Sequence, residues 1–153
     1  MKVPFSKPYF TKDMKVKILL NIKKIINEKK LMIGEFSVSL EKKFSNFIGV
    51  KYAVAVNSAT TALQIAIRYA NAEGKEVIVP SASFITNVSS VIFENAKPVL
   101  VDCDSNTLSY NISDLKSKIN KNTAAIVLLH LTGYIANNYK EIVKLAKENK
   151  VLL

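Results

Sequence analysis

The stretch "EVIVPSASFITNVSSVIFENAKPVLV", residues 76 to 101, contains two short β-branched runs with a helical pattern between them. The runs at residues 76–79 and 98–101 predict strands, and the apolar spacing across residues 84–94 predicts a helix. A strand, a helix and a second strand in this order are typical of a βαβ unit with parallel strands. This stretch therefore predicts an α/β fold.

The same alternation extends to both sides of that stretch. The further predicted elements, in chain order, are a strand at 52–56, a helix at 60–72, a short helix at 113–119, a strand at 124–129, a helix at 137–149 and an apolar run at 151–153 that begins another strand. Short apolar strands separated by helices predict a three-layer arrangement, in which helices cover both faces of a mainly parallel sheet.

The N-terminal part of the chain has a different pattern. Apolar residues recur at helical spacing across residues 12–29 and again across 36–47, which predicts two amphipathic helices joined through Gly34. We therefore expect a helical N-terminal arm at residues 1–50, followed by an α/β domain at residues 51–153.

Composition limits the class of protein. The chain has 153 residues and is 49% hydrophobic, enough for one domain with a real core. Cys103 is the only cysteine and His130 the only histidine, so the sequence predicts neither an internal disulfide nor a metal cluster. The N-terminus lacks the apolar region of a signal peptide, and no apolar stretch approaches the roughly 20 residues that span a bilayer. These features favour a cytoplasmic protein with no membrane association.

The formal net charge of +10 suggests nucleic-acid binding as one possible function. However, the basic residues are 21 lysines and the single Arg68, and the lysines recur along nearly the whole chain. Because arginine makes most planar contacts to phosphate and guanine, this composition favours a solvated surface and no nucleic-acid partner. Binding through the lysine-rich N-terminal helix remains an alternative, and it predicts a steep salt dependence.

Small polar residues gather where the predicted strand at 52–56 meets the next helix. In "AVAVNSATTALQIAI", residues 53–67, Asn57, Ser58, Thr60 and Thr61 occupy this junction. Free backbone N–H groups and the positive end of the helix dipole make such a junction an anion site, with Ala59 small enough for close approach. Alternatively, Ser58 or Thr60 simply caps the helix.

Two further strand ends place candidate residues at the same edge of the predicted sheet. In "VIVPSASFITN", residues 77–87, Phe84 falls in the first turn of the predicted helix, where its ring can cover a ligand bound at the first junction. Phe84 is equally compatible with a place in the core. The third strand end, "VLLHLTGY", brings His130 and Gly133 to this edge, where a lone histidine is more often structural than catalytic.

Several motifs in order resemble the DegT/DnrJ/EryC1/StrS family of sugar aminotransferases, which use pyridoxal phosphate and have the aspartate-aminotransferase type of fold. The resemblance extends along the whole chain. The matching stretches are "VPFSKPYF", "IGEFSVSLEKKFSNFIGVKYAVAVNSATTAL", "GKEVIVPSASFIT", "AKPVLVDCD" and "NTAAIVLLHLTGY".

The resemblance implies roles for individual residues. Ala59 and Thr60 stand at the family's phosphate-binding Gly-Thr pair with Ser58 beside them, and Phe84 stands at the aromatic residue that stacks on the pyridine ring. His130 matches the histidine of a His-x-x-Gly motif, to which no role is assigned. Residues 51–153 would then form part of the cofactor-binding large domain.

Four positions depart from the family's pattern. Ala59 replaces a glycine, which is tolerable only if φ at this residue is negative or the turn is relaxed. Asn95 also replaces a glycine, and asparagine is the residue that next best tolerates a left-handed backbone. Ser83 replaces a threonine, and Tyr134 replaces a frequent glutamine.

The resemblance also implies residues that this sequence lacks. In the family, the strand that begins at Val151 leads to a carboxylate that pairs with the pyridine nitrogen, and a lysine that forms the Schiff base follows further downstream. No lysine here stands at that motif, so no catalytic residue is assigned.

The implied protein is the N-terminal part of a homodimeric aminotransferase that moves an amino group, usually from glutamate, to a keto nucleotide-sugar. We expect these residues alone to be inactive and poorly soluble. The alternative is a non-catalytic phosphate- or nucleotide-binding α/β module.

Overall fold

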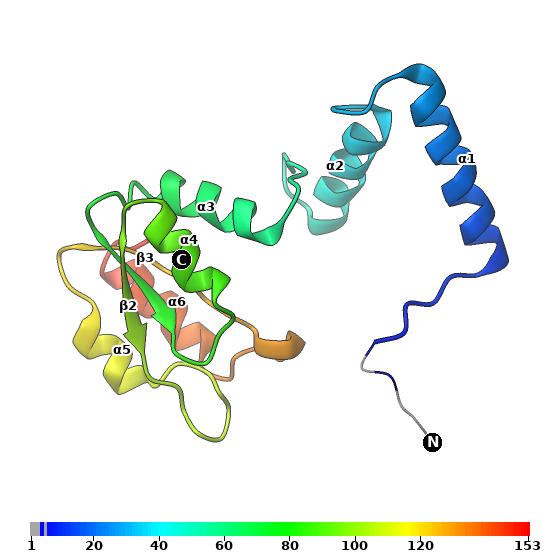
Figure 1. Ribbon diagram of the computed structural model, residues 1–153. Helices are drawn as coiled ribbons and strands as arrows, with labels where there is room; N and C mark the ends of the chain where they lie inside the picture. Colours follow the sequence, from blue (N-terminus) through cyan, green and yellow to red (C-terminus); the bar gives the residue numbers. More distant parts are fainter. Residues whose placement is uncertain (1–3, 5) are drawn as a thin grey trace. The chain divides into compact units, whose positions relative to one another are not determined.

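A computed structural model of the chain describes residue 4 and residues 6–153. The chain divides into two compact units, Met1–Ala55 and Val56–Leu153 (Figure 1). Two residues of the N-terminal family-like stretch, Val3 and Phe5, lie outside the described residues.

The first unit contains two helices, α1 (Lys12–Glu28) and α2 (Glu35–Ile48). Helix α1 begins at a threonine cap, because the Thr11 Oγ1 accepts a hydrogen bond from the Met14 N–H at 3.1 Å. Helix α2 begins directly after Gly34 and ends at Ile48. Gly49 follows with a φ of 77°, which turns the chain so that the Val50 N–H also reaches the Ser45 carbonyl, at 3.0 Å. The two helices predicted for the arm are therefore confirmed.

The second unit contains a parallel sheet of three strands with β1 at its centre, in the order β2-β1-β3. The stretch at residues 76–101 forms the predicted βαβ unit from β1, α4 and β2. The elements of this unit are α3 (Ala59–Tyr69), β1 (Glu76–Pro80), α4 (Thr86–Phe93), β2 (Lys97–Val101), α5 (Ile112–Lys118), β3 (Thr123–Ile126), the 3₁₀ turn η1 (Leu131–Gly133) and α6 (Tyr139–Glu148).

Successive residues of β1 point to opposite faces of the sheet, and both faces are covered (Figure 1). Val77 and Val79 pack with α3 and α4, whereas Ile78 packs with α5 and α6; all three side chains are fully buried. A strand buried on both faces reads as a continuous apolar run, which explains the sequence of β1. The predicted three-layer α/β fold is confirmed.

The strand predicted at residues 52–56 was wrong. The chain here is not part of any strand in the described residues, and Val54 is 77% exposed. In this segment the Ala55 N–H donates to a side chain, the Glu41 Oε1, at 2.9 Å. A β-branched run becomes a strand only when a neighbouring strand supplies the ladder of hydrogen bonds, and periodicity does not identify that neighbour.

Two predicted boundaries also need correction. Strand β3 ends at Ile126 and not at residue 129, because the Val127 carbonyl accepts a hydrogen bond from the Tyr110 hydroxyl in place of a strand partner. Phe84 precedes α4 by two residues, so it lies in the connection and not in the first helical turn. The run at 151–153 begins to pair as expected, through one parallel bridge between Ala125 and Leu152.

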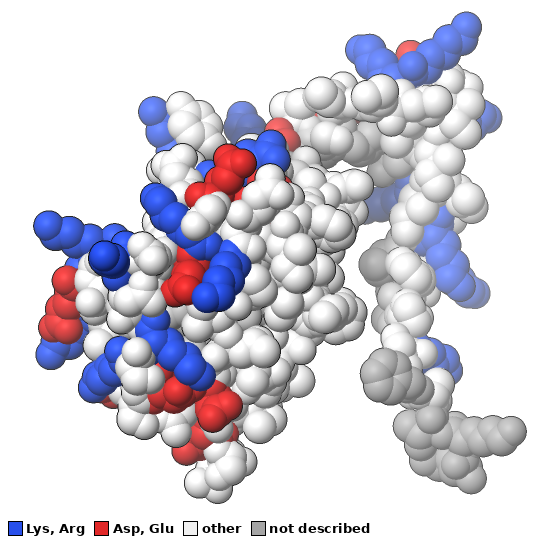
Figure 2. Space-filling view, turned by 60° about the vertical axis from the view of Figure 1, so that its left-hand side comes forward, with Lys and Arg blue, Asp and Glu red and all other residues white. Residues whose placement is uncertain are grey.

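Basic and acidic side chains are interspersed on the surface of the second unit that Figure 2 shows. Three ion pairs account for part of this mixture: Lys97 with Glu76 at 3.0 Å, Arg68 with Glu94 at 2.7 Å, and Lys118 with Asp114 at 2.7 Å. This face therefore lacks the continuous basic stripe that favours binding to a phosphate backbone. In the described part of the chain, no helix combines the length and apolar character needed to cross a bilayer.

Candidate functional site

The first turn of α3 is closed by a chain of polar side chains. Ser58 is the N-cap, because its Oγ accepts the Thr61 N–H at 3.1 Å. The Thr61 hydroxyl donates to the Asn57 Oδ1 at 2.8 Å, and the hydroxyls of Ser58 and Thr61 lie 3.0 Å apart. Since the Thr61 proton is engaged with Asn57, the Ser58 hydroxyl is the donor between these two. The structure thus shows that Ser58 caps the helix.

Capping leaves part of this helix terminus available. The Ala62 N–H is bonded to the Ser58 carbonyl at 3.2 Å, but the hydrogen bonds of the described residues include none from the amides of Ala59 and Thr60. None of them involves the Thr60 hydroxyl either. Ala59 is the first helical residue, so its φ is negative and alanine replaces glycine here without strain. Two amides and one hydroxyl at a helix N-terminus can bind an anion.

Helix α4, which follows the second junction, packs against α3. The Ser90 Oγ lies 3.5 Å from the Thr60 carbonyl, and Ser90 is fully buried. Phe84 is 71% exposed, so it is not a core residue in this structure. The hydrogen bond from α4 to the first junction comes from Ser90 and not from Phe84, so a site shared by Phe84 and Thr60 stays a prediction.

Cys103 connects the loops that follow β1 and β2. Its Sγ accepts the Ala82 N–H at 3.4 Å and lies 3.6 Å from the Ser81 Oγ. No sequence pattern predicts this role, because the two loops are adjacent only once the parallel strands are paired. Within residue 4 and residues 6–153, no group of three His, Cys, Asp or Glu residues could hold a metal ion.

Tyr110 is a buried polar residue that sequence reasoning also missed. It is 2% exposed, and its hydroxyl donates to the Val127 carbonyl at 2.9 Å and lies 3.4 Å from the Ile78 carbonyl. Burial raises the pKa of this phenol far above its ordinary value, and nearby Cys103 raises the pKa further. Tyr110 therefore joins the middle of β1 to the end of β3 as a neutral hydrogen-bond donor.

His130 closes the loop that follows β3. Its Nδ1 accepts the Ala136 N–H at 3.2 Å, so the remaining proton of the neutral ring is on Nε2. The loop between these residues turns through Thr132 and Gly133, whose φ values of 54° and 88° are left-handed. This contact gives His130 a definite structural role.

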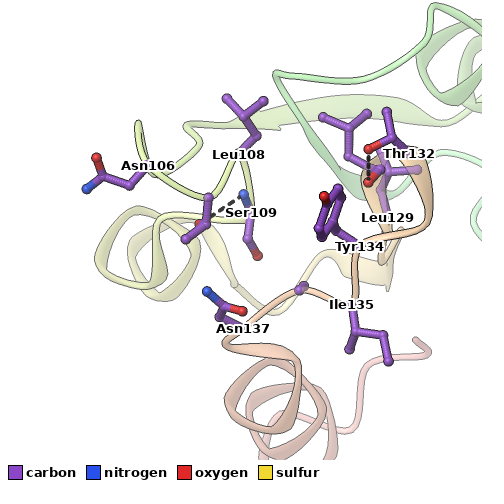
Figure 3. A pocket seen from close by; sticks show the side chains of 11 residues that line it. Asn106, Leu108, Ser109, Leu129, Thr132, Tyr134, Ile135 and Asn137 are labelled. Carbon is purple, nitrogen blue, oxygen red and sulfur yellow. Dashed lines mark hydrogen bonds between the residues drawn. The ribbon is translucent and has the colours of Figure 1, made fainter.

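A cavity of about 370 Å³ lies between the loop after β2 and the loop after β3 (Figure 3). Leu108 and Ser109 line one side, and Leu129, Tyr134 and Asn137 line the other. None of Ser58, Ala59, Thr60 and Phe84 lines this cavity. This cavity is therefore separate from the predicted phosphate site.

The fold is a three-layer α/β arrangement around a parallel sheet, and the N-terminus of α3 is suited to an anion. The model of the DegT/DnrJ/EryC1/StrS aminotransferase family matches residues 12–153. The chain therefore belongs to this family.

Individual relatives agree with this assignment. The GDP-perosamine synthase of Caulobacter vibrioides is 38% identical over 122 residues, which are 79% of this chain and 33% of the relative. An aminotransferase from Psychrobacter cryohalolentis matches with a TM-score of 0.83 and 28% identity, over 97% of this chain and 37% of that chain. GDP-4-keto-6-deoxy-D-mannose-3-dehydratase of E. coli with bound hydrated PLP matches with a TM-score of 0.83 and 29% identity, over 98% and 39%. The chain spans about a third of the length of the first relatives that it matches.

Proposed function

We propose that this chain is the N-terminal part of a pyridoxal-phosphate-dependent aminotransferase that acts on a keto nucleotide-sugar with a glutamate-type amino donor. Family membership supports the reaction class. The relatives named for GDP-linked sugars support the substrate class. When bound, pyridoxal phosphate would supply an electron-accepting ring through which an amino group is transferred.

The observation that carries the proposal is the free N-terminus of α3. The amides of Ala59 and Thr60 would donate to the phosphate of the cofactor, and the Thr60 hydroxyl would add a third hydrogen bond. The dipole of an 11-residue helix favours the negative charge at this end. Ser58 would help mainly by fixing the backbone, because its hydroxyl is engaged with Thr61 in this structure.

Phe84 would orient the pyridine ring by stacking on it. The Phe84 ring is 71% exposed, so a flat ligand that stacks on it would bury apolar surface of both rings. The connection that holds Phe84 is itself fixed, because the Ser83 hydroxyl donates to the Pro80 carbonyl at 2.8 Å. The exposed ring is therefore presented on a defined turn.

The remaining parts of the proposal concern the assembly. We propose that residues 1–50 act as a helical arm and residues 51–153 as part of the cofactor-binding domain. The proposed protein is cytoplasmic and forms a homodimer when complete. These 153 residues alone bind the cofactor weakly and do not catalyse transamination, since no lysine matches the family's Schiff-base motif.

The proposal is tested with pyridoxamine 5′-phosphate, a ligand that lacks the aldehyde and so cannot react with the 21 lysines. The key variant is Ala59→Pro, which deletes one amide at the first helical position, where proline is well tolerated. Ser58 is already extended, with φ −157° and ψ 157°, as a residue before proline requires. We expect Ala59→Pro and Thr60→Ala each to weaken binding about tenfold, because each loses a hydrogen bond to a charged group.

Lys12→Pro is the matched control. Lys12 is the first residue of α1 and follows Thr11, which is also extended, so the substitution makes the same backbone change at another helix. This control should bind pyridoxamine 5′-phosphate as the parent does. Equal binding by the parent and Ala59→Pro would exclude the α3 amides as the phosphate site. Equal binding of unphosphorylated pyridoxamine would also contradict the proposal.

A further inference from the structure

Helices α3 and α4 lie side by side, and two polar contacts join them (Figure 1). Near the start of α3, the Ser90 hydroxyl of α4 donates to the Thr60 carbonyl at 3.5 Å. In the last turn of α3, the Arg68 Nε donates to the Glu94 Oε2 at 2.7 Å. The helix pair is therefore joined at the proposed phosphate end and again about 12 Å further along α3, at a rise of about 1.5 Å per residue.

The Ser90 side chain is a buried hydroxyl group whose partner lies on another helix. Ser90 has no exposed surface. A serine inside a helix commonly bonds to the carbonyl four residues before it, which here belongs to Thr86. The hydrogen bonds of the described residues include none between these two residues, and the acceptor of the Ser90 hydroxyl is the Thr60 carbonyl. Because a buried hydroxyl needs a partner, this contact contributes to the spacing of the two helices.

The acceptor belongs to the turn that is proposed to hold the phosphate. Thr60 is the second residue of α3, and its amide and hydroxyl are two of the groups assigned to the phosphate. Inside a helix, its carbonyl also accepts the amide four residues further on, so the Ser90 contact is additional to the helical hydrogen bond. Because helix ends fray, a hydrogen bond from a neighbouring helix restrains this turn where restraint is needed most.

Helix α4 also connects Ser90 to the segment that carries Phe84. The Asn87 N–H donates to the Phe84 carbonyl at 3.0 Å, so the turn that holds Phe84 continues directly into the first turn of α4. Backbone hydrogen bonds thus join Phe84 to α4, and the Ser90 hydroxyl joins α4 to Thr60. A change at Ser90 would therefore alter the spacing between the two proposed cofactor contacts.

We propose that Ser90 is a positioning residue for cofactor binding, which holds the Thr60 turn at a fixed spacing from the connection that carries Phe84. This inference rests on the proposed function, because the groups that Ser90 positions are those assigned to the phosphate and to the pyridine ring. Ser90 acts through the Thr60 backbone, since its own side chain has no exposed surface. A turn that is ordered before the ligand arrives loses less conformational entropy on binding, so the contact raises affinity for the phosphorylated ligand.

The test compares the parent chain with Ser90→Ala, each ¹⁵N-labelled and titrated with pyridoxamine 5′-phosphate and, separately, with pyridoxamine. Alanine removes the hydroxyl without enlarging the side chain, and the Thr60 carbonyl keeps its helical partner, so the variant should fold. We expect Ser90→Ala to weaken binding of the phosphorylated ligand about threefold and to leave pyridoxamine binding unchanged. A merely structural role would lower the melting temperature without changing the ratio of the two affinities. Ser90→Cys keeps a weak donor of similar size and should recover part of the loss.

Ser89→Ala and Glu94→Gln are the matched controls. Ser89 is the neighbouring, half-buried serine of α4, so its substitution removes a hydroxyl from the same helix in another direction. Glu94→Gln removes the charge that holds Arg68 and so weakens the other contact between the two helices. Both variants should bind pyridoxamine 5′-phosphate as the parent does.

The outcomes separate this inference from the proposed function. If Ser90→Ala binds the phosphorylated ligand as the parent does, with the same shifts of the Ala59 and Thr60 amides, the positioning role alone is overturned. An equal loss for both ligands, or the same loss in Glu94→Gln, would indicate a general loosening of the helix pair and would overturn it too. If the Ala59 and Thr60 amides of the parent do not respond to pyridoxamine 5′-phosphate, the proposed function fails, and the positioning role fails with it.

Discussion

The two units of the chain share an amphipathic helical pattern but differ in what covers it. In the described part of Met1–Ala55, the only buried residue is Ser45, and α1 has no buried residue. In Val56–Leu153, by contrast, two clusters fill both sides of a sheet, and Ile78, Leu115 and Ile142 have no exposed surface. An apolar stripe predicts a helix in both cases, but only the second unit contains the partner layers that convert this stripe into a core.

The difference implies that the two units contribute unequally to the free energy of unfolding. An isolated helix of 17 residues is only marginally stable in water, because most helical stability in proteins comes from packing of the apolar face. We therefore expect the cooperative transition of this chain to report on the second unit. Equivalent substitutions in the two units test this expectation.

The largest contrast is expected between Ile78→Ala in β1 and Leu19→Ala in α1. Ile78 is fully buried, so its truncation removes apolar contacts and leaves a cavity, at a cost of about 2–5 kcal/mol. Leu19 is 67% exposed, and its truncation should change the free energy of unfolding by less than about 0.5 kcal/mol. Urea unfolding followed by circular dichroism measures both. Similar losses would show that the first unit has a core of its own.

The next effect is expected for Tyr110→Phe, which keeps the ring but deletes the hydroxyl bonded to the Val127 carbonyl. The loss should be about 1 kcal/mol at neutral pH. Because folding raises the Tyr110 pKa above its ordinary value of 10.0, the native state favours the protonated phenol. The stability that this pKa shift contributes is fully present below pH 10 and is lost as the pH rises above 10. Stability of the parent should therefore fall faster than that of Tyr110→Phe above pH 10, and parallel curves would contradict this account.

A smaller contrast is expected between the helix caps of the two units. Ser58→Ala removes the acceptor for the Thr61 amide and should lower the free energy of unfolding by about 1 kcal/mol. Thr11→Ala removes the corresponding acceptor for the Met14 amide in α1. It should increase hydrogen exchange within α1 while leaving the cooperative transition unchanged. An equal shift of the transition for both variants would mean that the two units unfold together.

The smallest contrast concerns ion pairs. In the second unit, Lys118 and the Asp102 amide both donate to the Asp114 carboxylate and lower its pKa below 3.8. The resulting stability is present above pH 3.8 and is lost as the pH falls through the lowered pKa. The melting temperature of Asp114→Asn should therefore be lower than that of the parent at pH 6 and equal to it at pH 2. In the first unit, Glu35→Gln breaks the exposed pair with Lys24 and should leave the melting temperature unchanged. A pH-independent difference for Asp114→Asn would exclude the charge as its cause.

Much of the fold was predictable because its signals are local. The βαβ unit at residues 76–101 follows from apolar runs of suitable length, and the left-handed backbone at Asn95, with φ 54°, follows from the side chain's tolerance of that region. The prediction at residues 52–56 failed because strand formation depends on a partner. The contacts of Tyr110 and Cys103 were missed for a related reason, since they join segments that meet only in the folded sheet.

The candidate site was predictable only in part. The sequence located the polar junction at residues 57–61, but it left capping and anion binding as alternatives. The structure shows that these functions can belong to different residues, since Ser58 and Thr61 form the cap while the Ala59 and Thr60 amides are free. Residue type alone does not separate the two, because hydroxyl side chains are suited to both.

The central claim is that the N-terminus of α3 binds the phosphate of the cofactor. Its most direct test is a titration of the ¹⁵N-labelled chain with pyridoxamine 5′-phosphate. Pyridoxamine, which lacks the phosphate, is the control ligand. We predict that the amide signals of Ala59 and Thr60 move together and saturably with the phosphorylated ligand only, while the amide of Lys12 in α1 does not move. Stationary Ala59 and Thr60 signals, with binding detected elsewhere in the chain, would contradict the claim.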